Sequence, residues 1–170
     1  MDKRDRDKER RKQRRLEELG TNRPVCIACG CTDWYTFEGH HIAGRHFDKH
    51  VEYFCSNCHR RFTEAGKSRP QPSSKSPGAA ECAGQYCLGL SDIFEPVARM
   101  LDDYGNKLVQ LPNSRETGSD TDKSLTAEIG HFLIALAAIL GRVGHRLEHY
   151  GTGLIDEAKR NATNARGAGT

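Results

Sequence analysis

The carboxyl-terminal half of the chain carries apolar residues at helical spacing. One stripe between positions 90 and 108 is formed by Leu90, Ile93, Phe94, Val97, Met100, Leu101, Tyr104 and Leu108. Recurrence every three or four residues is typical of an amphipathic helix. Ser91 or Asp92 can cap the start of this helix, and Pro96 restricts where its first regular turn begins.

A second helix is expected from about Leu125, after a polar loop over 112–123. Its apolar residues repeat at intervals of four and three, namely Ile129, Leu133, Leu136, Leu140, Val143, Leu147 and Tyr150. This repeat is a heptad seam, and the simplest arrangement is an antiparallel hairpin over 87–150 in which the two stripes meet. Further apolar residues widen the face, so we hypothesise a homodimer through these helices, completing a four-helix bundle.

Shorter patterns precede the hairpin. Alternating aromatic and polar residues predict a strand over 34–38 and a second over 51–54, and a helix is expected over 57–65, ending at Gly66. The stretch 67–80 is rich in Pro, Ser and Gly and predicts a flexible linker, which we extend to 86. The tail over 151–170 is expected to fray.

The first 20 residues differ from the rest in charge. Residues 1–19 hold nine Lys/Arg and six Asp/Glu, a balance of +3, which leaves 26 − 9 = 17 basic and 23 − 6 = 17 acidic residues elsewhere. The segment has no apolar stripe before Leu16, so it is either disordered or a solvated single helix. It is either an electrostatic arm for phosphates or a leader without a specific role.

Four cysteines form two CxxC pairs. Cys26 and Cys29 make the first pair and Cys55 and Cys58 the second, with 25 residues between them. Two such pairs supply the four thiolates of a tetrahedral structural zinc site. Burial of four cysteines as small apolar residues explains the doubled spacing poorly. We expect Cys31, Cys82 and Cys87 to be free thiols, because a second zinc site would need more ligands.

A closed four-thiolate site has no vacancy for the histidines that lie around it. His40 and His41 are adjacent, and His59 follows the last cysteine directly. A neutral imidazole is both a metal ligand and a base that titrates near physiological pH. Phosphodiester hydrolysis with one metal ion needs both, although the same histidines could orient other groups in a zinc module that does not cut.

The order of CxxC, HHIxGR and CxxCHR resembles the zinc-knuckle branch of the HNH endonucleases, the ββα-metal nucleases. The resemblance covers about 25–64. It implies an α+β fold class, in which a small zinc-stabilised ββα-metal (treble-clef-like) module over 21–66 precedes the linker and the α-helical hairpin. It also implies a metal-dependent endonuclease that hydrolyses phosphodiester bonds in DNA.

Carried over to these positions, the resemblance makes His41 the general base and makes His40 and His59 ligands of a catalytic divalent ion, Mg or another. The middle position of the family's motif is commonly asparagine, but here it is His50. A histidine there would orient the base through a ring nitrogen, or the site would be weakened.

The resemblance also implies contacts with nucleic acid. Arg45 would touch a phosphate, and Arg60 and Arg61 lie where the backbone would pass. Residues 39–69 contain six Lys/Arg against three Asp/Glu, a balance that suits a polyanion. His46 is expected to be a surface residue.

Composition is that of an ordinary soluble protein, with 36% hydrophobic and 29% charged residues. The longest apolar run, 132–140, is nine residues, where about 20 are needed to cross a bilayer, so we expect a cytoplasmic protein with no membrane partner. Two alternatives to a nuclease remain: a non-catalytic zinc-dependent DNA-binding or adaptor module, and a helical interaction protein whose zinc site is purely structural.

Overall fold

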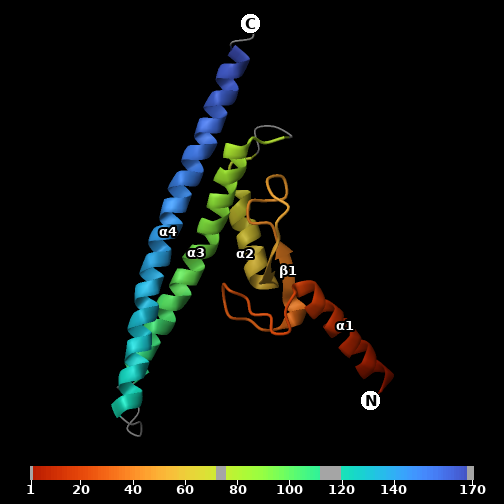
Figure 1. Ribbon diagram of the computed structural model, residues 1–170, viewed down its shortest axis with the longest axis vertical. Helices are drawn as coiled ribbons and strands as arrows, with labels where there is room; N and C mark the ends of the chain where they lie inside the picture. The colour runs from red at the N-terminus through yellow and green to blue at the C-terminus, as the bar shows by residue number, and fades with distance from the viewer. Residues whose placement is uncertain (1, 72–75, 112–119, 168–170) are drawn as a thin grey trace.

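The computed structural model describes residues 2–71, 76–111 and 120–167. In this part of the chain the fold is α+β and mostly helical, with four α-helices and a two-stranded sheet. The elements in chain order are α1 (Lys3–Leu19), a 3₁₀ turn η1 (Trp34–Thr36), β1 (Phe37–His40), β2 (Glu52–Cys55), α2 (Ser56–Lys67), α3 (Ala79–Gln110) and α4 (Asp120–Gly167). Figure 1 shows α3 between α4 on one side and the sheet with α2 on the other.

The charged amino-terminal segment is the solvated helix α1. Asp2 caps its first turn, and Gly20 ends it in the left-handed conformation at φ 66°. Leu16 is its only buried residue, and the Arg15 guanidinium donates a hydrogen bond to the carbonyl oxygen of Phe37. Only the last turn is therefore docked, and the remainder projects away from the body of the molecule (Figure 1).

Strands β1 and β2 are antiparallel, with Phe37 opposite Cys55 and His40 opposite Glu52. The first strand begins later than the alternation at 34–38 predicts, because the Asp33 carboxylate accepts from Tyr35 N and curls 34–36 into η1. The second strand and the helix lie within two residues of their predicted places. We call residues 21–69 the cysteine module.

The core of the cysteine module is aromatic. Phe54 and Phe62 are fully buried, with ring centroids 4.8 Å apart, and α3 contributes Ile93 to the same cluster. Burial of each such side chain contributes about 2 kcal/mol. Leu90, Phe94 and Val97 pack around the cluster, so the apolar stripe predicted on α3 faces the cysteine module. This holds for 90–97, where the expectation that the stripe faces the second helix is met only in part, since Phe94 Cβ also lies against Gly144 of α4.

Helices α3 and α4 meet through small residues. On α4 the buried positions recur every seven residues, at Gly130, Ala137, Gly144 and Gly151. A Cβ on Gly105 would lie 2.7 Å from the carbonyl oxygen of Gly130, so the two backbones are in close contact. The predicted seam is displaced from this contact, because residues such as Ile129, 46% exposed, are too large for it.

Both long helices extend further than expected. Helix α3 begins at Ala79, within the stretch predicted as linker, and α4 continues through 151–167, where we expected a frayed tail. The reason is packing, because Ile155 is 1% exposed and lies over Gly84. Most of the loop expected over 112–123, and residues 72–75 of the linker, lie outside the described residues.

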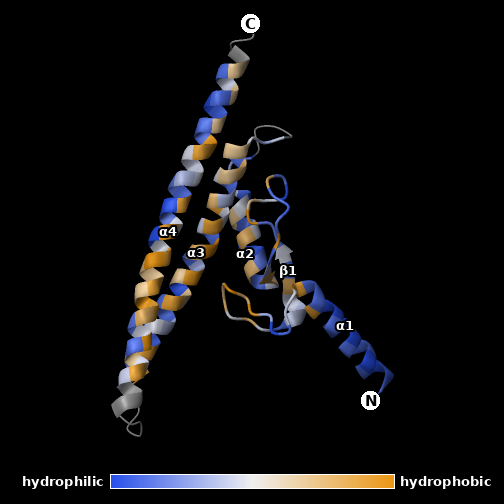
Figure 2. Cartoon of the chain, viewed as in Figure 1, coloured by the Kyte–Doolittle hydropathy of each residue, from blue (hydrophilic) through white to orange (hydrophobic). Residues whose placement is uncertain are grey.

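Helix α4 is long and apolar enough to cross a membrane, by length and composition. An 18-residue window within 124–165 has a mean hydropathy of 1.6, and 11% of it is buried. The sequence expectation counted an uninterrupted apolar run, whereas a window average passes over the polar residues within it. Figure 2 shows this apolar part in orange on the half of α4 nearest its amino-terminal end.

Candidate metal centre and histidine cavity

The four CxxC cysteines converge. The Sγ atoms of Cys26, Cys29, Cys55 and Cys58 all lie within 4.8 Å of one another, and Cys29 and Cys55 Sγ are 3.5 Å apart. Tetrahedral zinc with bonds of about 2.3 Å places its sulfurs about 3.8 Å apart. The donor set therefore fits a structural metal such as zinc, and no other group of three or more His, Cys, Asp or Glu with this geometry occurs in the described residues.

Local backbone structure brings the two pairs together. After Cys26, a tight turn is closed by Gly30 N, which donates to Cys26 O over 2.7 Å, and Gly30 has a positive φ of 73°. Cys55 ends β2, and Cys58 lies in the first turn of α2. The second pair is therefore placed by the junction between strand and helix.

The cysteines of the cluster differ in the direction in which their thiol pKa values are shifted. Burial would raise the pKa of Cys26, but hydrogen bonds from the backbone N–H groups of Cys55 and Ala28 outweigh it and lower this pKa. Burial raises the pKa of Cys58 strongly, with contributions from the neighbouring cysteines. Cys26 therefore loses its proton more readily than Cys29 or Cys58, whose pKa values are raised, and metal binding must release the protons that the thiols carry.

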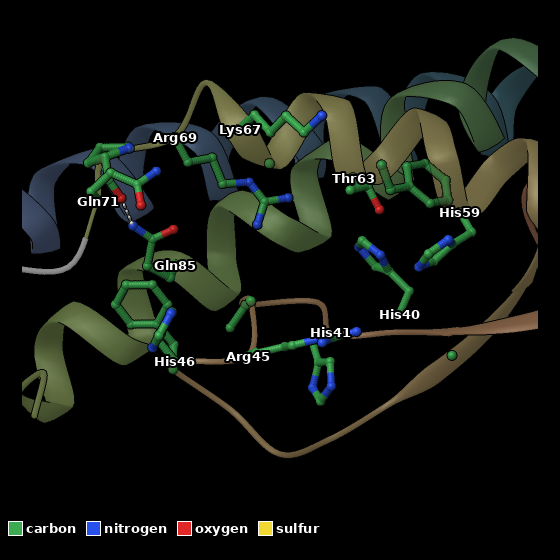
Figure 3. A pocket seen from close by; sticks show the side chains of 17 residues that line it. His40, His41, Arg45, His46, His59, Thr63, Lys67, Arg69, Gln71 and Gln85 are labelled. Atoms are coloured by element: carbon green, nitrogen blue, oxygen red, sulfur yellow. Dashed lines mark hydrogen bonds between the residues drawn. The ribbon is translucent and has the colours of Figure 1, made fainter. Parts of the chain in front are cut away.

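His40 and His59 face each other. His40 ends β1 and His59 lies in the first turn of α2, and their ring centroids are 5.4 Å apart. Figure 3 shows both rings directed into the same space beside Thr63. They line a cavity of about 380 Å³. Among the described lining residues the charged ones are Arg45, Lys67 and Arg69, and no Asp or Glu is present.

His40 is neutral at physiological pH. Its burial, followed by the neighbouring His59 and Arg69, lowers its pKa to about 4. Its ring rests against Phe54 and Phe62, at centroid distances of 5.9 and 5.8 Å. A buried neutral imidazole keeps a lone pair free, and this is the form that binds a metal ion.

The orientation of His59 depends on Glu38, which the sequence analysis did not single out. His59 Nδ1 lies 2.9 Å from Glu38 Oε2. A carboxylate only accepts, so Nδ1 carries a proton, and in the neutral ring Nε2 has the free lone pair. Carboxylates hold metal-binding histidines in this way. The sequence did contain a signal for this contact, because Glu38 lies two residues before His40 and a strand places such residues on the same face.

His41 is held by the main chain. Its Nδ1 is 3.2 Å from the carbonyl oxygen of Asp48, and since a carbonyl only accepts, Nδ1 is protonated and Nε2 is free to act as a base. His41 borders the same cavity, but Figure 3 shows its ring on the other side of the loop from His40 and His59. Adjacent residues at a strand end alternate in this manner.

The His50 side chain is paired with Glu52. Its Nε2 is 2.8 Å from Glu52 Oε1, its side chain is 57% exposed, and its backbone N donates to Asp48 Oδ1. The main-chain carbonyl of Asp48 occupies the place that the resemblance gives to His50. Any influence of His50 on the base passes through the loop.

The three arginines expected to bind nucleic acid do not share one surface. Arg45 borders the cavity and makes no ion pair within the described part of the chain. Arg60 borders a second pocket, which is also lined by Glu38 and His59. Arg61 is exposed and lines neither pocket.

Arg69 was missed, because it lies in the stretch interpreted as linker. It contacts the Asp92 carboxylate of α3, with Nε 3.0 Å from Oδ2, and donates from Nη1 to the carbonyl oxygen of Ile42 over 2.9 Å. Gln85 of α3 donates to Pro70 O nearby, and His46, expected at the surface, also borders the cavity. The cavity wall is thus fixed to α3.

Searches against protein family models, curated proteins and solved structures found no match for this chain. The class of the protein therefore rests on its own fold and site: an α+β protein whose cysteine cluster could hold a structural metal such as zinc.

Proposed function

We propose that this protein is a metal-dependent endonuclease of the HNH type, which hydrolyses phosphodiester bonds in DNA. The observation that carries the proposal is the pairing of two histidine rings, 5.4 Å apart, in a cavity whose charged lining residues are all basic. Such a cavity attracts a polyanion. The module would have the treble-clef-like ββα-metal arrangement, with zinc on the four cysteines.

His40 and His59 would hold a divalent ion such as Mg²⁺, which supplies positive charge to the scissile phosphate and the leaving oxygen. Both residues suit this role, because burial keeps His40 neutral and Glu38 fixes the tautomer of His59. Arg45 would bind a phosphate oxygen, since it borders the cavity without an acidic partner among the described residues.

His41 would activate the water. Its Nδ1 proton is directed at the Asp48 carbonyl, so Nε2 can accept a proton from water, and general base catalysis of this kind contributes about 10²- to 10⁴-fold. Its ring lies away from His40 and His59 in Figure 3. The proposal therefore requires a change of the His41 rotamer, or of loop 41–50, when DNA binds.

The test is cleavage of supercoiled plasmid by the zinc-loaded protein with added Mg²⁺ or Mn²⁺. His41→Ala should lower the rate by at least about 100-fold while circular dichroism stays unchanged. The matched control is His145→Ala, which removes a histidine whose side chain is 85% exposed on α4 and should leave the rate unchanged. A folded His41→Ala protein that cuts at the normal rate would contradict the assignment.

One observation favours the alternative, a zinc-dependent DNA-binding or adaptor module. His50 is paired with Glu52 and leaves His41 without a side-chain partner from that position. If the wild-type protein binds DNA but cleaves none under any divalent ion, this alternative replaces the nuclease. In that case His50→Asn, which restores the common residue of the motif, is the variant to test for recovered cleavage.

A further inference from the structure

Helix α4 carries an apolar stripe that the hairpin does not cover. Its members follow one another at intervals of three, four or seven residues, and their exposed fractions run from 38% to 65%. They are Leu125, Ile129, Phe132, Ile139, Val143 and Tyr150. Leu136, half-buried, fills the gap between Phe132 and Ile139. The sustained 3–4 spacing is that of a coiled-coil seam.

The stripe and the contact with α3 lie on different faces of α4. Each small residue against α3 follows a stripe position by one residue, as Gly130 follows Ile129 and Gly144 follows Val143. One residue corresponds to about 100° of rotation around a helix. A second helix can therefore approach the stripe without displacing α3.

A membrane is the first occupant to consider, because this part of α4 is apolar enough to span one. However, Gly105 packs on Gly130, so the last turns of α3 run beside the apolar part of α4. Those turns carry five charged residues, Glu95, Arg99, Asp102, Asp103 and Lys107. Spanning would place these charges in hydrocarbon, which is costly, and the observations favour a protein partner.

The charged residues beside the stripe indicate which protein partner it binds. Glu128 and Arg142 each directly precede a stripe residue, and both are exposed with no ion pair in the part of the chain that the structure describes. They lie seven residues to either side of Ala135. A copy of α4 turned end to end about Ala135 brings each Glu128 to the Arg142 of the other copy.

We propose that the stripe binds a second copy of this chain, α4 against α4 in antiparallel orientation. In an antiparallel coiled coil the core layers are centred one residue away from such flanking pairs, here on Ile134. Ile129 then lies opposite Ile139 of the partner subunit, and Leu125 opposite Val143 of the partner subunit. Apolar residues therefore meet in every layer from 125 to 143, and the interface closes on itself with two-fold symmetry. This proposal does not depend on the proposed nuclease activity.

The first test is the molar mass of the full-length, zinc-loaded protein by light scattering at micromolar concentration. The expected mass is that of two 19.0 kDa chains. Phe132→Arg with Ile139→Arg should give a monomer with unchanged helicity, because both side chains are exposed in the single chain. The matched control is Tyr104→Arg, an equally exposed site on α3, which should remain dimeric. A monomeric wild type, or a dimer that survives the double substitution, overturns the proposal.

The second test concerns the register. Glu128→Arg or Arg142→Glu alone places like charges together at two symmetric positions and should weaken the dimer about tenfold. The protein with both changes should regain the wild-type dissociation constant, because the opposite charges face each other again. If the double reversal binds as weakly as the single changes, the antiparallel register is wrong. Loss of vesicle binding in the Phe132→Arg, Ile139→Arg protein, with the wild type monomeric, would instead assign the stripe to a membrane surface.

Discussion

The cysteine module and the helical hairpin are stabilised by different means. In the module, four thiol sulfurs lie within 4.8 Å of one another and aromatic rings fill a small core. In the hairpin, α3 and α4 approach so closely at their glycines that a Cβ on Gly84 would lie 2.8 Å from Gly151 O. The short region thus has the donor set of a structural metal site, whereas the long helices meet where side chains are absent. The two should fail under different perturbations.

The largest effect is expected from metal removal. Structural zinc contributes about 10–16 kcal/mol to the folding of small zinc modules, so a chelator, or Cys26→Ser, should unfold residues 21–69. The α3–α4 pair should remain helical, since its contacts involve no cysteine ligand. Trp34 fluorescence reports on the module, and circular dichroism at 222 nm reports mainly on the two long helices.

A control for this experiment is Cys87→Ser, which changes a free thiol on α3 and should alter neither signal. Simultaneous loss of fluorescence and of most helical signal on chelation would contradict the separation. It would mean that the hairpin depends on Ile93 and its neighbours being covered by the module.

The next effect concerns the glycine contact. Gly130→Ala places a methyl group 2.8 Å from Gly105 O and 2.7 Å from a methyl of Val109, and such overpacking costs about 1–3 kcal/mol. Gly141→Ala on the same helix meets no atom within 4 Å, and should stabilise the protein by up to about 1 kcal/mol, because alanine has the higher helix propensity.

Denaturant unfolding followed by circular dichroism checks both glycine variants. The expected result is a lower midpoint for Gly130→Ala and an equal or higher one for Gly141→Ala. Equal shifts in the same direction would mean that helix propensity alone matters, and that the two helices do not meet at Gly130.

A smaller effect is expected from Glu38→Gln. Glutamine is a weaker acceptor for the His59 Nδ1 proton, and loss of such a carboxylate lowers metal affinity about 10- to 100-fold. Glu52→Gln is a matched control, because Glu52 pairs with His50 at 2.8 Å, outside the cavity. Calorimetric titration of Mn²⁺ into zinc-loaded protein measures both. An equal loss for the two variants would count against His59 as a ligand.

The sequence was informative where chemistry sets the spacing. The CxxC pairs predicted the cysteine cluster because a tetrahedral metal imposes the pattern, and the second strand and α2 follow from the same knuckle. The partners of the histidines were not predicted, although the period of β1 placed Glu38 on the same face as His40. Glu38 comes close to His59 only through the pairing of β1 with β2, and Arg69 reaches Asp92 from a stretch with no periodicity.

The hairpin shows the opposite case. Its two helices and their antiparallel pairing were predicted from periodicity, but the contact face was not. A hydrophobic pattern shows where large apolar side chains lie. It does not detect a stripe of glycine and alanine in which each member comes one residue after a large apolar residue. The seam through Ile129 and Val143 was therefore assigned to α3, whereas the structure leaves it exposed.

The smallest effect is expected from the protonation of His40 in the cysteine module. Its pKa in the folded protein is about 4 because of burial and then of nearby positive charge, whereas an unfolded chain has a histidine pKa near 6.5. At pH 5 about a tenth of the folded molecules carry the proton, against more than nine tenths of the unfolded ones. The unfolded state binds the proton first as pH falls. The contribution of His40 to the free energy of unfolding is therefore complete above about pH 6.5 and declines towards pH 4.

The pKa of His40 is measured by NMR of its ring carbons between pH 5 and 8, with zinc bound and no other divalent ion. The urea-unfolded chain is the control. A midpoint near 6.5 in the folded protein would show that His40 is solvated, and would remove the reason for regarding it as a preformed neutral ligand.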